Sequence, residues 1–350
     1  MKKQFLLFPL FLSFSLISCL NSSKEVIYDI TDSPILNIED TIFRFEDKLA
    51  IGIAVQDSTA FIIQYNSDTC MLALNLNTRK LIKGFGFKGS GPEDVVSPEF
   101  MPSLDNSHAV FLVDVNSKKL LSIENSGNKT FHLKKLMTFP AEIFPASNLN
   151  YSNQVLVGRQ SKIGSNKMFF IYDQKKHTKV DVSSNPDIPG LKDPNYFCAP
   201  HLALNAAQHK IIAGMYLMDM FHVYDLEGKH IKSVCFSKDY IPKMDKKGGA
   251  LDLNQGFRGI YNLFPTDDFC YLMRVIEKPV FKNGDVVSTT RELFLVKVDW
   301  DGKLISSYRI NDEIGGHFYV DEKQKKLFAI RHTVESTSKE FYDVVTYSLK

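Results

Sequence analysis

Residues 210–236 read KIIAGMYLMDMFHVYDLEGKHIKSVCF and contain the pattern that predicts the fold. The apolar run Lys210–Met215 is followed by two further strand-like segments, Met220–Leu226 and His230–Phe236. These two segments are joined by Glu227-Gly228-Lys229, and an acid followed by glycine between apolar alternations is a strong hairpin signal. With a strand before Lys210, the stretch predicts a sheet of four antiparallel strands.

The same pattern recurs along the chain. Six apolar runs can be superimposed, each preceded by a polar turn rich in Asp, Asn and Ser, and their starts are 45 to 59 residues apart. The runs are Ala60–Tyr65, Ala109–Asp114, Gln154–Arg159, Lys210–Met215, Phe269–Arg274 and Lys326–Arg331. The sequence therefore predicts an all-β protein, a six-bladed β-propeller with four antiparallel strands per blade.

The last unit lacks a strand. It ends at Lys350 directly after its third segment, and an unfilled sheet edge favours aggregation. Strand-like material precedes the first unit, in Val26–Ile30, Ile35–Ile38 and Ile42–Phe45. We expect an N-terminal strand to close the last blade; the alternative is an unpaired N-terminal tether.

The N-terminus has the features of an export signal. Met1-Lys2-Lys3 is followed by an apolar run from Phe5 to Ile17, which is shorter than the roughly 20 residues of a membrane span. Leu16-Ile17-Ser18-Cys19 fits the lipobox of bacterial lipoproteins, in which the cysteine is lipidated; the alternative is an ordinary cleaved signal. We expect residues 1–18 to be a signal peptide, 19–24 a lipidated tether and 25–350 a single propeller domain. The protein is then exported and lipid-anchored in the cell envelope, in the outer membrane.

Charge and cysteine usage restrict the partners. The leader contains two lysines and no acid, so the mature chain has 40 basic and 40 acidic residues. This balance argues against a nucleic-acid partner, which requires a clustered basic excess. Cys70, Cys235 and Cys270 lie in apolar runs and are expected to be buried core residues.

Two stretches carry a family resemblance. Lys83-Gly-Phe-Gly-Phe-Lys-Gly-Ser-Gly-Pro-Glu93 resembles the glycine-rich link between early blades in Bacteroidetes-type six-bladed propeller lipoproteins of the TolB-like and NHL-like group. Gly256–Tyr261, followed by Asp268 and Tyr271, is similar to the start of the penultimate blade in that group. Asp94 departs from the pattern, because an aromatic residue is common after the glutamate. The resemblance implies the fold and the membrane anchor more than any chemistry.

The glycine-rich link also contains Gly84-x-Gly86-x-x-Gly89, a formal dinucleotide fingerprint. A phosphate-binding loop needs a helix directly after it, and Pro92 and Pro98 disfavour one. We interpret the stretch as a loop that crosses between blades. Glu93 either points at a ligand or caps backbone amides at the end of this loop.

Arginines recur at one position of the repeat. The sixth residues of the aligned runs are Tyr65, Asp114, Arg159, Met215, Arg274 and Arg331. Arg258 lies in a loop expected on the same face of the propeller. Converging guanidinium groups hold carboxylates, sulfates or phosphates through paired hydrogen bonds. We therefore predict that Arg159, Arg258, Arg274 and Arg331, with Glu93, form a shallow anion- or sugar-binding site at the channel mouth; alternatively, each arginine pairs with a nearby acid or is solvated.

The sequence leaves two functions open. The first is a non-enzymatic binding or scaffold module with a protein or glycan ligand at the propeller face, a membrane contact through the lipid alone, and no cofactor. The second is a lactonase- or lyase-like enzyme with a divalent cation in the central channel. No catalytic residue and no metal-ligand motif is recognisable, and no G-x-S-x-G elbow occurs. The sequence favours the binding module.

Overall fold

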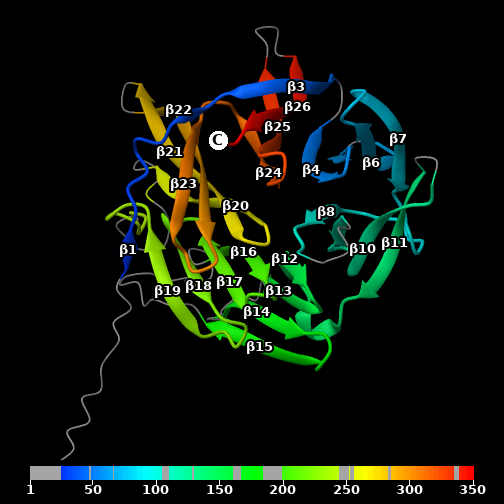
Figure 1. Cartoon of the computed structure of the whole chain (residues 1–350), viewed down its shortest axis with the longest axis horizontal. Helices are drawn as coiled ribbons and strands as arrows, with labels where there is room; N and C mark the ends of the chain where they lie inside the picture. Colours follow the sequence, from blue (N-terminus) through cyan, green and yellow to red (C-terminus); the bar gives the residue numbers. More distant parts are fainter. Residues whose placement is uncertain are drawn as a thin grey trace, which may run out of the picture.

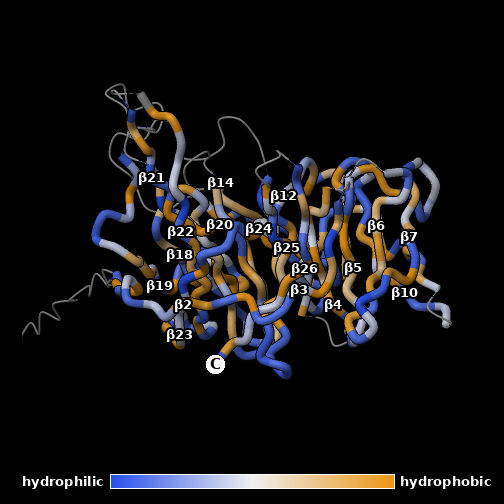
Figure 2. Tube along the Cα trace, turned by 90° about the horizontal axis from the view of Figure 1, so that it is seen from above, coloured by the Kyte–Doolittle hydropathy of each residue, from blue (hydrophilic) through white to orange (hydrophobic). Residues whose placement is uncertain are grey.

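The computed structural model describes residues 25–46, 49–65, 67–104, 110–127, 130–160, 167–183, 199–243, 252, 256–282, 285–334 and 339–350. Cys19 and the leader lie outside the described residues. Figure 1 shows six sheets arranged in a ring, and Figure 2 shows the ring edge-on as a thick disc. The predicted six-bladed β-propeller is confirmed. Within the described ranges, no helix is long and apolar enough to cross a bilayer.

Blades one to three are antiparallel sheets whose strands follow one another from the axis outward. Blade one contains β4 (Ala50–Gln56), β5 (Thr59–Gln64), β6 (Thr69–Asn75) and β7 (Lys80–Phe87). Blade two contains β8 (Pro98–Met101), β9 (Phe111–Asp114), β10 (Lys119–Asn125) and β11 (Phe131–Thr138). After the short 3₁₀ helix η1 (Ala141–Ile143), blade three contains β12 (Ala146–Ser152), β13 (Val155–Gln160), β14 (Lys167–Asp173) and β15 (Thr178–Ser183).

Blades four and five repeat this order, and blade six takes its outer strand from the N-terminal segment. Blade four contains β16 (Pro200–Asn205), β17 (Lys210–Met215), β18 (Met220–Tyr224) and β19 (His230–Cys235). Blade five contains β20 (Phe257–Pro265), β21 (Phe269–Lys282), β22 (Asp285–Asp299) and β23 (Leu304–Ile310). Blade six contains β24 (Ile314–Asp321), β25 (Lys326–Val334), β26 (Glu340–Ser348) and β3 (Ile38–Phe45). The long hairpin β21–β22 protrudes from one face of the disc (Figure 2).

The N-terminal segment closes the ring, as predicted. Strand β3 pairs antiparallel with β26, with Phe43 opposite Val344 and Arg44 opposite Asp343. Two shorter strands precede it: β1 (Val26–Ile27) and β2 (Ile35–Leu36) pair parallel with the outer strands of blades four and five. The N-terminal segment was expected to complete one blade, and it also adds a fifth, parallel strand to two others.

Among the described residues, the core consists of six clusters of buried side chains, one between each pair of neighbouring blades. Successive residues of a strand point to opposite sides of its sheet. In β5, Phe61 faces the cluster shared with blade two, and Ile62 faces the cluster shared with blade six. Both faces of each blade are therefore buried, which explains why the second strands are continuous apolar runs.

The outer hairpins follow the predicted turns. Gly228 and Gly302 adopt φ values of +80° and +73°, a region that favours glycine. The carboxylate of Asp225 accepts hydrogen bonds from the backbone N–H groups two and four residues further on, and Asp299 does the same in blade five. The predicted burial of Cys70, Cys235 and Cys270 is also confirmed, and all three are free thiols.

Candidate functional site at the channel mouth

The inner strands of the six blades surround a central channel with a volume of about 1230 Å³. Each inner strand begins where the chain passes from one blade to the next, and we call this end of the channel the connection mouth. The opposite end, where each inner strand turns into the second strand, is the turn mouth. The two mouths carry different side chains.

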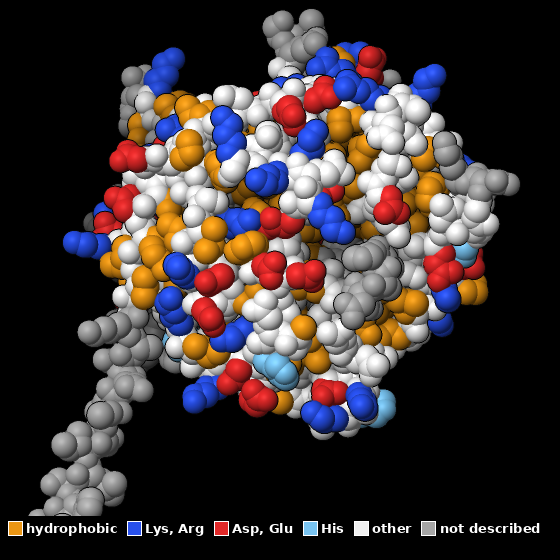
Figure 3. All heavy atoms as spheres, in the orientation of Figure 1, with side chains coloured by type: hydrophobic (Ala, Val, Ile, Leu, Met, Phe, Trp, Pro, Cys, Tyr) orange, Lys and Arg blue, Asp and Glu red, His pale blue; other side chains and the backbone are white. Residues whose placement is uncertain are grey.

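The turn mouth is acidic. Asp57, Asp267, Asp268, Asp321 and Glu322 line the channel at the turns that follow β4, β20 and β24. Figure 3 shows this face of the disc, with acidic side chains gathered near its centre. Glu322 belongs to a local network, because Tyr271 donates a 2.6 Å hydrogen bond to it and Lys297 lies 3.1 Å away.

The connection mouth is shaped by irregular inner strands. The pairing register breaks between Ser147 and Asn150 in β12, between Ile260 and Asn262 in β20, and between Ile314 and Phe318 in β24. A β-bulge redirects the side chains at the break, and bulges are common beside functional sites. The side chains at these three breaks that line the channel include Asn148, Tyr261 and His317. Local backbone geometry thus turns polar side chains of three blades toward the axis.

Aromatic rings form part of this wall. The Tyr216 ring lies 5.7 Å from the ring of His201 and 6.0 Å from the ring of Tyr261, between ring centroids. Tyr261 packs directly on the backbone of the neighbouring inner strand, since a Cβ on Gly316 would lie 2.3 Å from its Cε1 atom. Gly316 is therefore required for the position of Tyr261.

Burial determines the charge of the ionisable groups here. Desolvation, together with the nearby His317 and Arg159, lowers the pKa of His201 to about 4. Desolvation also lowers the pKa of His317. Both imidazoles are therefore neutral hydrogen-bonding groups at neutral pH, and Arg159 supplies a positive charge. Partial desolvation raises the pKa of Glu99, an exposed side chain that lines the channel on β8.

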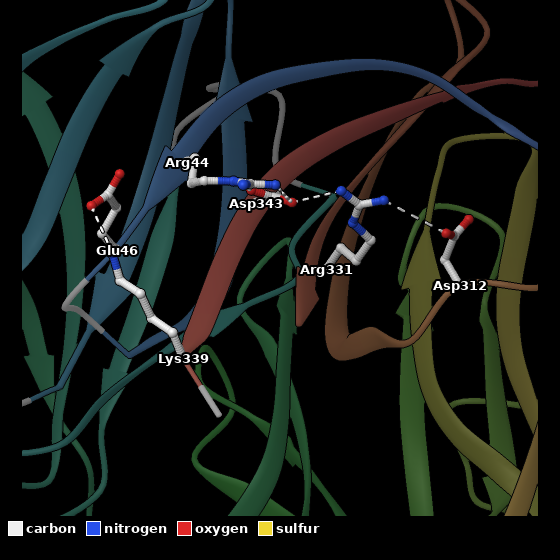
Figure 4. Close-up of polar contacts among 6 residues, drawn as sticks. All are labelled: Arg44, Glu46, Asp312, Arg331, Lys339 and Asp343. Atoms are coloured by element: carbon white, nitrogen blue, oxygen red, sulfur yellow. Dashed lines mark hydrogen bonds and ion pairs between the residues drawn. The ribbon is translucent and has the colours of Figure 1, made fainter. Parts of the chain in front are cut away.

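Of the four predicted arginines, Arg159 lines the described wall of the channel and the other three do not. Arg274 is buried and donates hydrogen bonds of 2.5 and 2.8 Å to Asp219. Arg331 lies 2.6 Å from Asp343 and 3.8 Å from Asp312 (Figure 4). Arg258 is half-buried on β20 outside the channel wall. The four arginines therefore do not converge on one site as expected. Arg274 and Arg331 follow the alternative, in which each pairs with an acid.

The physical reason is the distance of the second strand from the axis. Only the inner strand of a blade faces the channel along its length, and the sixth position of the second strand points into the wedge between blades. Asp114 at this position accepts hydrogen bonds from the backbone N–H groups of Val96 (2.8 Å) and Ser97 (3.2 Å), in the link between blades one and two. At this position Asp114 therefore anchors a blade connection, whereas the side chain of Arg159 reaches the channel.

The glycine-rich link has its own capping acid, which is not the predicted one. Glu93 is exposed, and the neighbouring Asp94 accepts a 2.9 Å hydrogen bond from the Gly91 N–H. Lys119 fastens the link by donating to the carbonyl groups of Gly91 (2.6 Å) and Asp94 (3.0 Å). The capping role considered for Glu93 therefore belongs to Asp94, the residue at which the sequence departs from the family pattern.

Sequence reasoning missed His201, Tyr216, Tyr261, His317 and Glu99 as channel residues. For all of these except Tyr216, which directly follows the run Lys210–Met215, the available signal was the polar and aromatic side chains in the segments preceding the aligned runs, which become the inner strands. In the part of the chain that the structure describes, no group of three or more His, Cys, Asp or Glu side chains is arranged to hold a metal ion.

A family model described as TolB-like 6-blade propeller-like matches residues 47–323, more than half of the chain. The chain belongs to this TolB-like family. The resemblance seen in the glycine-rich link is confirmed at the level of the family. Among curated protein sequences, none is significantly similar to this TolB-like chain.

Solved structures resemble this chain at low sequence identity, and one of them shows the same fold with a TM-score above 0.5. A member of the DUF4221 family from Bacteroides vulgatus is 13% identical, with a TM-score of 0.56, and the match covers 89% of this chain and 97% of that one. A streptogramin B lyase is 8% identical, with a TM-score of 0.42 and coverages of 86% and 97%. Regucalcin, a calcium-binding protein from Agrobacterium tumefaciens, is 10% identical, with a TM-score of 0.42 and coverages of 87% and 93%. The first of these similarities concerns the fold of the TolB-like chain, and none of the three assigns an activity to it.

Proposed function

We propose that this protein is a non-enzymatic binding module, held in the outer membrane by a lipid on Cys19, whose connection mouth binds an anionic ligand or a glycan. The lipobox-like Leu16–Cys19 supports the anchor. A lipid anchor leaves the propeller at the membrane surface. The balanced charge of the mature chain disfavours a nucleic-acid partner.

The observation that carries the proposal is the set of bulges at the connection mouth. Inner strands of three blades leave their regular register where Asn148, Tyr261 and His317 line the channel. A β-bulge re-aims the side chains at the break, and bulges are common beside functional sites. The irregular positions surround the same cavity as Arg159 and Tyr216.

The chemistry of this wall suits a polar organic ligand. Tyr216 and Tyr261 combine flat apolar faces with hydroxyl groups, and His201 and His317 supply neutral donors and acceptors. Arg159 adds a planar cation that matches a carboxylate, sulfate or phosphate. Apolar walls with a few convergent polar groups are typical of small-molecule sites.

The experiment is equilibrium binding of the full mature chain to a glycan array and to a panel of small anions. Tyr261→Ala is expected to weaken binding of every ligand found, by about tenfold or more. Phe281→Ala is the control, because this exposed side chain lies near the tip of the protruding hairpin, far along β21 from the channel. Binding that depends on Phe281 and not on Tyr261 would move the site to the hairpin.

The enzyme hypothesis is tested with the same preparation by elemental analysis and by assays with lactone substrates. Stoichiometric Ca²⁺ or Zn²⁺ together with turnover would replace the binding proposal by a metal-dependent lactonase- or lyase-like enzyme. We expect neither.

A further inference from the structure

The hairpin formed by β21 and β22 extends beyond the sheet of blade five. Its neighbours stop early, because β20 pairs with β21 only as far as Glu277, and β23 pairs with β22 only from Leu293 onward. Beyond these points β21 and β22 pair only with each other among the described strands. The far half of the hairpin is therefore a free two-stranded ribbon, and such ribbons are marginally stable in water.

The ribbon is charged near the sheet and apolar toward its end. Two ion pairs join its strands beside the sheet, Lys278–Glu292 at 2.8 Å and Arg291–Glu277 at 3.4 Å. The large apolar side chains farther out are 37% to 56% exposed, and they are Val280, Phe281, Val286 and Val287. Phe281 lies opposite Val286, so these two side chains share one face of the ribbon. The end of the hairpin thus presents a cluster whose transfer from water to an apolar phase is favourable.

The rim of blades four and five is apolar as well. Of the fifteen large apolar side chains that are exposed among the described residues, nine belong to these two blades, to the link between them, or to β1 and β2. Those on the outermost strands are Ile27 on β1, Ile231 on β19, Ile35 on β2 and Ile305 on β23. Figure 3 shows apolar side chains gathered over this side of the disc. Concentrated apolar surface of this kind is typical of a membrane or protein contact.

The segment that leads to Cys19 leaves the propeller on the same side. Strand β1 pairs with β19, and the hydroxyl of Tyr240 donates a 2.8 Å hydrogen bond to the carboxylate of Glu25, the first described residue. Figures 1 and 2 both place β19 and the hairpin on one side of the disc. Residues 19–24 span at most about 20 Å when fully extended. A lipid on Cys19 therefore holds the rim of blade four close to the bilayer.

We infer that the rim of blades four and five and the apolar end of the hairpin β21–β22 lie against the lipid bilayer. The inference rests on the lipid anchor of the proposed function and adds the orientation of the propeller. The partner is the bilayer because the short tether keeps lipid within reach of this surface. The rim is the edge of the disc, so the channel axis then runs roughly along the membrane plane, and both mouths of the channel stay open to water.

The first test measures contact with lipid. The mature chain is coupled through the Cys19 thiol to a maleimide lipid in phosphatidylcholine vesicles, so that the result does not depend on lipidation in cells. A Cys198→Ser background removes a competing thiol, and the thiols of Cys70, Cys235 and Cys270 are buried. Brominated phosphatidylcholine is expected to quench the added fluorescence of Phe281→Trp.

The control for this test is Leu136→Trp. Leu136 is 43% exposed on β11 of blade two, which lies across the ring from blade five (Figure 1). Its added fluorescence is expected to remain unquenched, because this rim faces away from the bilayer. Equal quenching of Phe281→Trp and Leu136→Trp overturns the inference.

The second test measures the partition of the unlipidated mature chain, carrying Cys19→Ala, into the same vesicles. The double variant Phe281→Ser, Val287→Ser is expected to partition about tenfold more weakly, because it loses apolar area that the bilayer covers. Leu136→Ser is expected to partition like the wild type. High salt is expected to leave the partition unchanged, since apolar surface drives the contact. A wild-type chain that does not partition, or a double variant that partitions equally well, overturns the inference.

The outcomes separate this inference from the proposed function. If Cys19 carries no lipid in cells but both vesicle tests succeed, the membrane-facing surface stands and the anchor fails. If Cys19 is lipidated and Phe281→Trp is not quenched, the anchor stands and the surface fails. If the wild-type chain forms dimers in solution and the double variant is a monomer, the apolar surface joins two copies of the chain, and the inference fails.

Discussion

Arg44 of the N-terminal strand β3 donates hydrogen bonds of 2.8 and 3.2 Å to the carboxylate of Asp343 on β26. Arg331 of β25 donates another, over 2.6 Å, so a fully buried carboxylate connects three strands of blade six (Figure 4). Burial by itself would raise the pKa of Asp343, but the hydrogen bonds from Arg44 and Arg331 lower it. The contact joins the first part of the chain to the last and stabilises the closed ring.

Replacing this acid is expected to destabilise the propeller. Asp343→Ala removes the partner of two guanidinium groups, and we expect the free energy of unfolding in urea to fall by about 3 kcal/mol. Asp40→Ala on the neighbouring strand β3 is the control, because Asp40 and Arg79 form a pair with side-chain exposures of 36% and 54%. The control is expected to lose at most about 1 kcal/mol. Equal losses in the two variants would contradict the role of Asp343 in closure.

Arg274 is expected to be structural. Its guanidinium joins blade five to Asp219 of blade four and stacks on Phe236 and Phe294, with distances of 5.6 and 5.1 Å to the ring centroids. Arg274→Met leaves a buried carboxylate without its partner and is expected to cost about 3 kcal/mol of unfolding free energy. The double variant Arg274→Met, Asp219→Leu is expected to recover most of this loss. Weaker ligand binding in a folded double variant would instead return Arg274 to the binding site.

Acid is expected to weaken the fold through its buried histidines. Burial, with His230 nearby, lowers the pKa of His222 to about 3, and that of His201 is lowered to about 4. The unfolded chain titrates these groups near pH 6.5, so it binds protons that the folded chain does not. Stability is therefore complete above about pH 6.5 and falls toward pH 4, by up to about 1.4 kcal/mol per pH unit for each histidine.

Urea unfolding between about pH 7.5 and pH 4.5 measures this slope. His222→Asn keeps a hydrogen-bonding group near Ser233, whose hydroxyl lies 2.9 Å from the Nδ1 atom of His222, and is expected to reduce the slope. The half-exposed His132 on β11 provides the control, and His132→Asn is expected to leave the slope unchanged. If His222→Asn has the same slope as the wild type, this histidine is not a source of the pH dependence of stability.

A pair of adjacent glycines tests the channel wall. Gly316→Ala places a Cβ 2.3 Å from Cε1 of Tyr261, so the ring must move; we expect a loss of about 1–3 kcal/mol in stability and weaker ligand binding. In Gly315→Ala the nearest atom, the carbonyl oxygen of Ile330, is 3.5 Å away, and no change is expected. Thermal unfolding and a crystal structure of each variant provide the measurement. An unmoved Tyr261 ring in Gly316→Ala would contradict the prediction.

The membrane anchor is tested at Cys19. Cys19→Ala is expected to release the protein from the membrane fraction, and mass spectrometry of the wild-type N-terminal peptide is expected to detect the lipid. Ser18→Ala keeps a small residue before the cysteine and is expected to remain anchored. Membrane retention of Cys19→Ala would show that another feature holds the protein there.

Much of the ring could be predicted from local sequence. The aligned runs became the second strands of all six blades, with starts within two residues of the observed ones, because continuous apolar runs between polar turns are a local signal; β21 and β25 extend beyond the ends of their runs. The strand-like residues before the first unit were recognisable from the same local signal, and they predicted that the N-terminal segment supplies the outer strand of the last blade. The parallel pairing of β1 and β2 was missed, because two-residue strands have too little pattern to specify a partner.

The candidate site could be predicted only in part. Arg159 was selected for its position in the repeat and does line the channel, whereas Arg274 and Arg331 share that position and are held by Asp219 and Asp343. A repeat position defines the place of a residue along its strand, but the acids that capture its side chain come from distant parts of the chain.

The sequence by itself determined the blades, their number and the strand that closes the ring, because turn chemistry and the burial of both sheet faces are recorded in residues close together along the chain. The tertiary structure alone decided which side chains face the axis. Asn148, Tyr261 and His317 line the channel at breaks in strand register, and such breaks depend on how neighbouring blades meet. A channel wall assembled from one strand of every blade has no continuous signature in the sequence.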